Sequence, residues 1–351
     1  MERPLWQRHR VADAEKTIKK DILFYLIPIP LTLCSLLVGP SDLVSARHIW
    51  EWAVNGIFQT GFAQNYDKEL LEAVVLNTRL PRIILALLIG ASLTASGTTL
   101  QALFRNPLVS PDILGLSSGA AFGAALAFVI PYLPVQPLAF VFGLAAAALS
   151  YFLAVKNREI STVSLILAGV IVSAVFTSLL TILQFFSDPF KLQSIIHWTM
   201  GNLHNASWMK VKSAAPLIVA GCVWLFIMRW RMNVVALGEE ETRVVGLDPR
   251  REKLLLLIPA TLIASASVAV SGIIGMVGLA VPHMVRIMVG PDNTKTIPVS
   301  FAFGGSFLLI VDTLSRTMTS FEIPVGIFTT LIGGPFFVIL LKRAKLLPMG
   351  A

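Results

Sequence analysis

Residues 163–186 read VSLILAGVIVSAVFTSLLTILQFF, a stretch of 24 residues without a single charged side chain. A helix of about 20 apolar residues is long enough to cross the hydrocarbon core of a bilayer. Helix formation also pairs the backbone groups of the segment with one another, which lipid cannot do. The stretch therefore predicts a membrane-spanning helix and raises the question of how many others the chain contains.

The composition of the whole chain is typical of a membrane protein. Of its 351 residues, 55% are hydrophobic and only 14% are charged, whereas soluble domains carry about 25% charged residues. Ten apolar runs are present, at 22–38, 83–104, 113–130, 135–155, 163–186, 212–228, 254–271, 273–290, 297–315 and 324–341. Strand-like alternation is absent from the sequence, which argues against a β-barrel. We expect an all-α integral membrane protein with about ten transmembrane helices, and a further short helix at 191–200.

The cationic side chains predict the orientation of these helices. The net charge is +8, and the Lys and Arg residues lie at the ends of apolar runs rather than on one face, which favours a membrane topology over nucleic-acid binding. With both termini in the cytoplasm, that side receives Arg105, Lys156, Arg158, residues 229–253, Lys295 and Lys342. The opposite side keeps Arg79, Arg82, Lys191, Lys210, Lys212 and Arg316. Residues 22–343 then form one transmembrane domain, between a cytoplasmic extension at 1–21 and a cytoplasmic tail at 344–351.

The sequence contains no motif for catalysis, metal binding or nucleotide binding. A phosphate-binding G-x-x-x-x-G-K-[ST] loop and an H-E-x-x-H motif are both missing. Cys34 and Cys222 lie within apolar runs and are expected to pack there. His197 and His204 are interpreted as polar residues at the membrane interface. We therefore expect no enzyme activity, no metal and no cofactor in this chain.

Acidic side chains within the apolar runs are almost limited to Asp312, near the outer end of its run. Arg316 follows four residues later, one helical turn away, so the two are expected to form an ion pair with each other. A carrier driven by protons or sodium usually needs several carboxylates at mid-membrane. Their absence indicates that energy for transport would come from outside this chain.

The segment ALGEEETRVVGLDPRR, residues 236–251, is strongly polar although it lies between two apolar runs. Nine charged side chains fall within the fifteen residues from Glu239 to Lys253. Two interpretations are open: a solvated loop, or a short docking helix for a soluble partner that supplies energy from ATP.

Motifs along most of the chain resemble those of the FecCD family of ABC import permeases. They are NTRLPRIILALLIGASLTASGTTLQALFRNPLVSPDILG (77–115), STVSLILAGV (161–170), WTMGNL (198–203), ALGEEETRVVGL (236–247), SGIIGMVGLAVPHMVR (271–286), VDTLSR (311–316) and EIPVGIFTTLIGGPFFVILL (322–341). The resemblance implies a type II ABC importer permease fold with ten helices per subunit. It also implies a bacterial or archaeal cytoplasmic membrane as the location.

The resemblance further implies an assembly with several partners. A second permease subunit, either another copy in a homodimer or a paralogue, would complete the pathway. Two ATPase subunits would hold ATP and Mg²⁺, and an extracytoplasmic binding protein would deliver the substrate.

Particular residues match the family's functional positions. Contact with the ATPase would fall on Ala236, Leu237, Gly238, Glu239, Thr242, Val245, Gly246 and Leu247. Docking of the binding protein would fall on Arg79, Arg82 and Arg316. The cytoplasmic gate would be formed by Asn106, Leu108, Ser161 and Thr162. The fifth span and the short helix after it, with WTMGNL, would line the outer half of the pathway together with the last span.

The resemblance favours an iron chelate, such as a siderophore or haem, or a similar chelate such as cobalamin. A molybdate- or tungstate-type oxyanion importer of the same family is the first alternative. Two further alternatives are an ion-coupled secondary carrier and a zinc or manganese ABC permease with fewer spans.

Overall fold

The computed structural model describes residues 24–39, 45–58, 67–156, 159–319 and 321–346. The expected N-terminal extension, 1–21, lies outside these residues. Of the expected tail, 344–351, the part up to Leu346 belongs to the last helix, and the remainder also lies outside them.

Each of the ten predicted apolar runs forms a helix. These helices are α2 (Pro28–Leu37), α5 (Leu80–Leu103), α6 (Leu116–Val129), α7 (Val135–Ala154), α8 (Thr162–Phe186), α10 (Trp208–Leu237), α12 (Pro249–Ser271), α13 (Val277–Val289), α14 (Asn293–Thr317) and α15 (Val325–Leu346). By length and composition, six helical stretches of the described residues can cross a membrane: Lys68–Leu103, α7, α8, α10, α12 and α14. The all-α, multi-pass architecture predicted from the sequence is thus confirmed.

Shorter elements connect these helices. They are α3 (Ala46–Phe58), α4 (Lys68–Glu72), the π-helix η1 (Ala73–Arg79), the 3₁₀ turn η2 (Pro111–Leu114), α9 (Pro189–Thr199) and α11 (Glu239–Val244). Strands β1 (Val155–Lys156) and β2 (Glu159–Ile160) form a small antiparallel pair in which Val155 lies opposite Ile160. Helix α9 matches the short helix expected at 191–200, whereas α3 and α4 were not predicted from the sequence.

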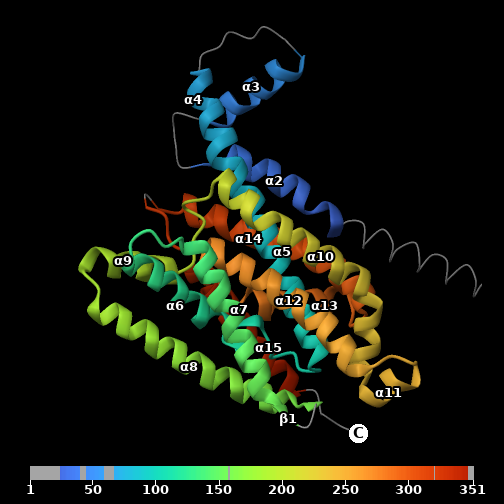
Figure 1. The fold of residues 1–351 in the computed structure, drawn as a ribbon. Helices are drawn as coiled ribbons and strands as arrows, with labels where there is room; N and C mark the ends of the chain where they lie inside the picture. Colours follow the sequence, from blue (N-terminus) through green and yellow to red (C-terminus); the bar gives the residue numbers. More distant parts are fainter. Residues whose placement is uncertain (1–23, 40–44, 59–66, 157–158, 320, 347–351) are drawn as a thin grey trace, which may run out of the picture.

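The bundle has two distinct ends (Figure 1). Helices α3, α4 and α9 lie toward one end, and α11, β1 and the end of α15 lie toward the other. Residues assigned to the cytoplasm from their charge gather at the second end; for example, the guanidinium of Arg105 donates to the carbonyl of Leu237 across 3.4 Å. We call the two ends the outer end and the coupling end.

Helix α5 runs through the interior of the bundle, packed by α10, α12, α13 and α14. Its small residues allow the backbones to approach closely, as in many membrane helix pairs. A Cβ placed on Gly97 would lie 1.9 Å from the carbonyl oxygen of Gly278, and one on Gly90 would lie 2.2 Å from that of Gly304. In the most apolar part of Lys68–Leu103, the helical stretch that contains α5, 78% of the residues are buried, whereas in the most apolar part of α8 28% are buried. The apolar outer faces, such as that of α8, are left for lipid or a second subunit.

Candidate functional site

Helix α11 is a compact turn held between α10 and α12 at the coupling end. Gly238 begins it with a φ of +151°. A Schellman motif ends it, in which the amide of Gly246 donates to the carbonyl of Arg243 and that of Leu247 to Thr242. Gly246 takes the left-handed conformation that this motif requires, with a φ of +84°. The glycines at 238 and 246 therefore shape the polar segment into a defined helix rather than an irregular loop.

Apolar side chains project from this otherwise charged segment. Leu237 is 65% exposed, Val244 87% and Val245 53%. Exposed apolar residues grouped within a charged rim are typical of a protein docking surface. Leu237 and Val245 were among the residues assigned to ATPase contact from the sequence, whereas Val244 was missed because its exposure depends on how α11 is turned.

Other predicted coupling residues stabilise α11 from within. Thr242 is buried, and its hydroxyl donates to the carbonyl of Gly238 across 2.5 Å. The carboxylate of Glu239 accepts from Lys253 and lies 3.5 Å from the guanidinium of Arg243. The hydrogen bond from Lys253 is the main reason why the pKa of Glu239 lies below its ordinary value. Ala236 and Leu247 are partly buried at either side of the helix. These residues stabilise the fold of the segment rather than form its most exposed part.

The residues predicted to form the cytoplasmic gate come from two segments that meet beside α11. The Asn106 side chain accepts from the amide of Leu108 at 2.9 Å, which folds the loop after α5 into a turn. Ser161 caps the start of α8, and the hydroxyl of Thr162 donates to the carbonyl of Phe104 at 3.2 Å. The structure therefore brings the two segments together, and Leu108 is left 47% exposed at the tip.

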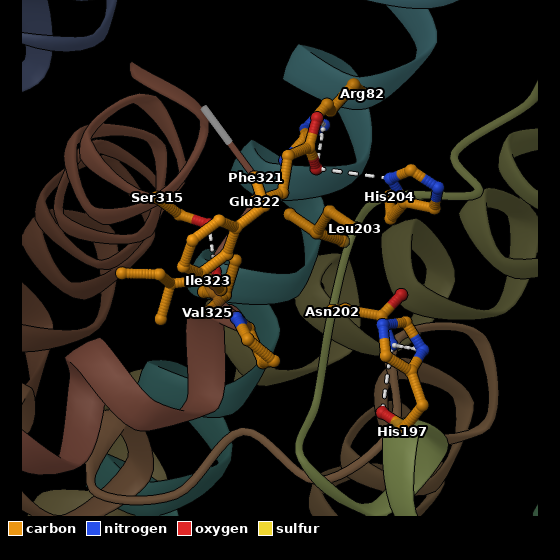
Figure 2. A pocket seen from close by; sticks show the side chains of 11 residues that line it. Arg82, His197, Asn202, Leu203, His204, Ser315, Phe321, Glu322, Ile323 and Val325 are labelled. Carbon is orange, nitrogen blue, oxygen red and sulfur yellow. Dashed lines mark hydrogen bonds and ion pairs between the residues drawn. The ribbon is translucent and has the colours of Figure 1, made fainter. Parts of the chain in front are cut away.

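A polar pocket of about 400 Å³ opens at the outer end of the bundle (Figure 2). Its walls come from α9 and the segment after it, and from the residues that lead into α15. The lining includes His197, Asn202, His204, Glu322 and Val325. The ring nitrogen Nδ1 of His204 lies 3.3 Å from a carboxylate oxygen of Glu322. Asn202 and Leu203 of the motif WTMGNL line this pocket, and the role of this motif in a pathway stays a prediction.

The pocket is not arranged as a metal centre. No group of three His, Cys, Asp or Glu side chains within the described residues is placed to hold a metal ion. The carboxylate of Glu322 is already engaged by Arg82, at 2.8 Å. Burial by itself would raise the pKa of Glu322, but the charge of Arg82 and its hydrogen bonds bring the pKa below the ordinary value.

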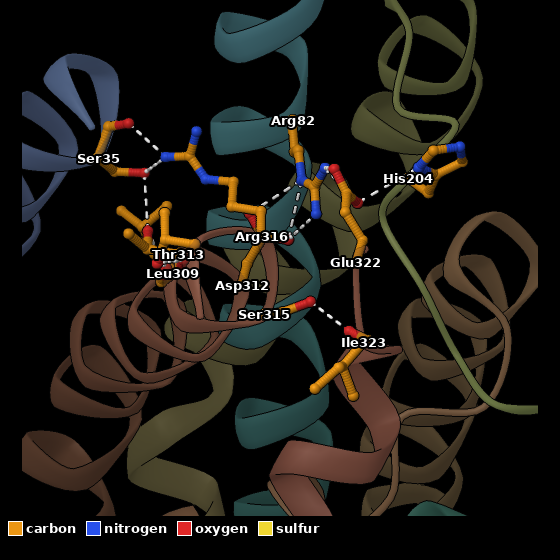
Figure 3. A network of polar contacts seen from close by, with 11 residues as sticks. Ser35, Arg82, His204, Leu309, Asp312, Thr313, Ser315, Arg316, Glu322 and Ile323 are labelled. Atoms are coloured by element: carbon orange, nitrogen blue, oxygen red, sulfur yellow. Dashed lines mark hydrogen bonds and ion pairs between the residues drawn. The ribbon is translucent and has the colours of Figure 1, made fainter. Parts of the chain in front are cut away.

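A network of charged side chains extends inward from the pocket wall, to which Arg82 and Glu322 belong (Figure 3). Arg82 donates through Nε to both carboxylate oxygens of Asp312, at 3.0 and 3.1 Å, and through Nη1 to Glu322. Arg316 instead donates to the hydroxyl of Ser35, at 2.8 Å. The expected ion pair between Asp312 and Arg316 is therefore wrong. Helix α5 supplies the partner of Asp312, which spacing along one helix cannot reveal.

The three arginines predicted to dock a binding protein are buried within this chain. Arg79, Arg82 and Arg316 are 4%, 6% and 4% exposed. The guanidinium of Arg79 donates to the carbonyl of Leu36 at 2.7 Å. Contacts between helices thus explain why these cations lie at the outer end, although most Lys and Arg residues are predicted on the cytoplasmic side. Their role in docking stays a prediction.

Two outer lysines also have structural partners. The ammonium of Lys191 donates to the carbonyl of Val129, at the end of α6, and that of Lys210 to Val270, near the end of α12. Both lysines thereby donate hydrogen bonds to carbonyl groups that have no partner within their own helix at its C-terminus.

Comparison with known proteins gives consistent matches along the chain. The model of the FecCD transport family matches residues 26–343. The cobalamin import system permease protein BtuC of Halobacterium salinarum is 43% identical over 277 residues, which cover 78% of this chain and 74% of that protein. A probable iron chelatin transport system permease protein of Helicobacter pylori is 38% identical and covers 81% of this chain and 87% of its own length.

A solved structure shares the fold over nearly its whole length. It is described as an inward-facing conformation of a metal-chelate type ABC transporter, with 31% sequence identity and a TM-score of 0.80. The similarity covers 93% of this chain and 99% of the other.

Proposed function

Because this chain belongs to the FecCD transport family, we propose that it carries a metal chelate across the membrane by alternating access, driven by a separate ATPase. Its relatives are permease subunits of ABC transporters, so the chain is a transport subunit and not an enzyme. The observation that carries the proposal is the exposed apolar group around α11: Leu237 at the end of α10, Val244 at the end of α11 and Val245 directly after it.

Energy would reach the chain through this surface. ATP and Mg²⁺ would be bound by two ATPase subunits at the coupling end, which would then face the cytoplasm. Closure of the ATPase dimer would move α11, and a shift of α10 and α12 would change the populations of inward- and outward-open states. Among the described residues, the buried carboxylates of Asp312 and Glu252 are each paired with an arginine, Arg82 and Arg231 respectively. This argues against the alternative of a secondary carrier.

Two further partners, a second permease subunit and a binding protein, are proposed at other surfaces of the chain. The apolar face of α8, with Val163, Leu167, Val170 and Ile171 exposed, supports pairing with a second permease subunit, as a homodimer or with a paralogue. An extracytoplasmic binding protein would deliver substrate to the outer end. The location would be the cytoplasmic membrane of a bacterium or archaeon, with both termini in the cytoplasm.

An iron chelate or cobalamin is the favoured cargo because the relatives reported above are cobalamin and iron chelatin permeases. The outer pocket is consistent with a bulky ligand that is recognised by shape and polar contacts. It presents amide and imidazole groups together with Phe321, and the guanidinium that could attract a small oxyanion, that of Arg82, is already paired with Asp312 and Glu322. This pairing favours a chelate over molybdate or tungstate.

Reconstitution tests the proposal directly. Vesicles containing this chain, its cognate ATPase and its binding protein would be offered iron-siderophore, haem, cobalamin and molybdate in turn. We expect one chelate to be taken up only with ATP and to stimulate hydrolysis. Uptake that follows a proton gradient and needs no ATPase would contradict the proposal.

A further inference from the structure

Arg105 has an unusual backbone conformation directly after α5. Its φ is +48°, in the left-handed region that residues with a side chain rarely adopt. Its amide donates to the carbonyl of Ala102, and the next amide, of Asn106, donates to Gln101. These two hydrogen bonds are those of a Schellman motif with Arg105 at the left-handed position.

Glycine is the residue that usually occupies this position, because it has no Cβ to clash with the backbone. Helix α11 ends with the same motif, and there the position is Gly246. An arginine at the end of α5 is therefore conformationally unfavourable unless its side chain contributes something in return. An observed outlier of this kind points toward a function.

The guanidinium of Arg105 reaches the segment that leads into α11. Nη1 lies 3.4 Å from the carbonyl oxygen of Leu237, and the positive charge also favours the ionised form of Glu239. A Cβ on Gly238 would lie 3.4 Å from the same nitrogen and 2.3 Å from a carboxylate oxygen of Glu241. The second distance is a clash and the first an ordinary contact, so Gly238 is required by Glu241, while Arg105 packs beside the backbone at the start of α11.

The backbone around Arg105 belongs to the gate segments. The preceding carbonyl, of Phe104, accepts from Thr162 at the start of α8. The following residue, Asn106, folds the loop that carries Leu108. Arg105 is consequently the point at which the docking helix, the loop after α5 and the start of α8 meet.

We propose that Arg105 is a positioning residue that links α11 to the cytoplasmic gate. A displacement of α11 by the ATPase would pull on the guanidinium and, through the left-handed turn, would move Asn106 and Leu108. This inference rests on the proposed function, because it assumes that α11 receives the ATPase. It adds the contact through which that movement reaches the pathway.

Three variants separate the side chain from the backbone. Arg105→Gly removes the guanidinium and also relieves the unfavourable conformation. Arg105→Lys keeps the charge and the conformational strain. Arg229→Ala is the matched control, because it removes an exposed cation whose contacts among the described residues are with Phe226 of its own helix, through the carbonyl and the ring.

Each variant would be reconstituted with the ATPase and binding protein. Measurements are ATPase association, ATP hydrolysis, uptake and thermal unfolding. Nucleotide-dependent labelling of Leu108→Cys, in a background without Cys34 and Cys222, reports movement of the gate.

We expect Arg105→Gly to unfold at the same temperature as wild type or higher, to bind the ATPase normally and to hydrolyse ATP. Its uptake per ATP should nevertheless fall at least tenfold, and labelling of position 108 should no longer respond to nucleotide. Arg105→Lys should keep most of the uptake, and Arg229→Ala all of it. A purely structural role would not raise stability and lower coupling together.

Wild-type uptake by Arg105→Gly would overturn the link, as would loss of ATPase association, since that would place Arg105 in the docking contact itself. If wild type shows no ATP-driven uptake, the proposed function fails rather than this inference alone.

Discussion

Replacement of Arg82 by methionine would leave the carboxylate of Asp312 buried without its partner. The Asp312 side chain is 1% exposed and that of Arg82 is 8% exposed, with 2.9 Å between Nη2 and the carboxylate. Removal of one member of a buried ion pair typically costs about 3–5 kcal/mol. The second carboxylate, of Glu322, is 28% exposed and can be hydrated, so its loss of Arg82 should add about 1 kcal/mol or less.

The assay measures the free energy of unfolding of the protein in detergent, by titration with a denaturing surfactant. Arg82→Met should lose about 3–5 kcal/mol, whereas the double variant with Asp312→Leu should recover most of that loss, because apolar residues can replace a buried pair at little cost. Glu322→Gln is the control and should change stability by about 1 kcal/mol or less. The double-mutant cycle isolates the coupling between Arg82 and Asp312.

An Arg82→Met variant within about 1 kcal/mol of wild type would refute this reasoning, because it would place Arg82 outside any buried pair. The same result would favour the docking role inferred from the family. In that case Arg82→Met should mainly weaken association with the binding protein, chiefly through the association rate.

Three further changes test other parts of the molecule. Val244→Asp should weaken ATPase association at least tenfold, about 1.4 kcal/mol, in a co-purification or titration assay, without changing the stability of the isolated chain. The pKa of Glu239 lies below its ordinary value of 4.5, so the excess thermal stability of wild type over Glu239→Gln should be constant above that pH and disappear as the pH falls through the lowered pKa. Gly97→Ala should lower the free energy of unfolding by about 1–3 kcal/mol, because its Cβ would press on the carbonyl of Gly278; an unchanged value would contradict the close contact between α5 and α13.

Much of the fold could be predicted from the sequence because each span is specified by the apolar residues within it. A long apolar run such as 163–186 satisfies the requirements of the bilayer by itself, whatever its neighbours are. All ten runs therefore formed helices, and the middle of the polar segment at 236–251 formed a short helix, α11, which is one of the two interpretations that the sequence left open. The glycines of that segment were also informative, since Gly246 ends α11 through its left-handed backbone.

The partners of individual side chains could not be predicted in this way. Asp312 and Arg316 are neighbours along one helix, yet Asp312 pairs with Arg82, which is 230 positions away in the sequence. The exposure of Val244 and the contact of Arg105 with Leu237 likewise depend on how separate helices pack. The apolar runs of the sequence thus determined which segments form the long apolar helices, although α10 extends to Leu237, well beyond the predicted run 212–228. Only the tertiary structure decided which charges meet, because the helix packing that brings them together depends on close backbone contacts between distant segments.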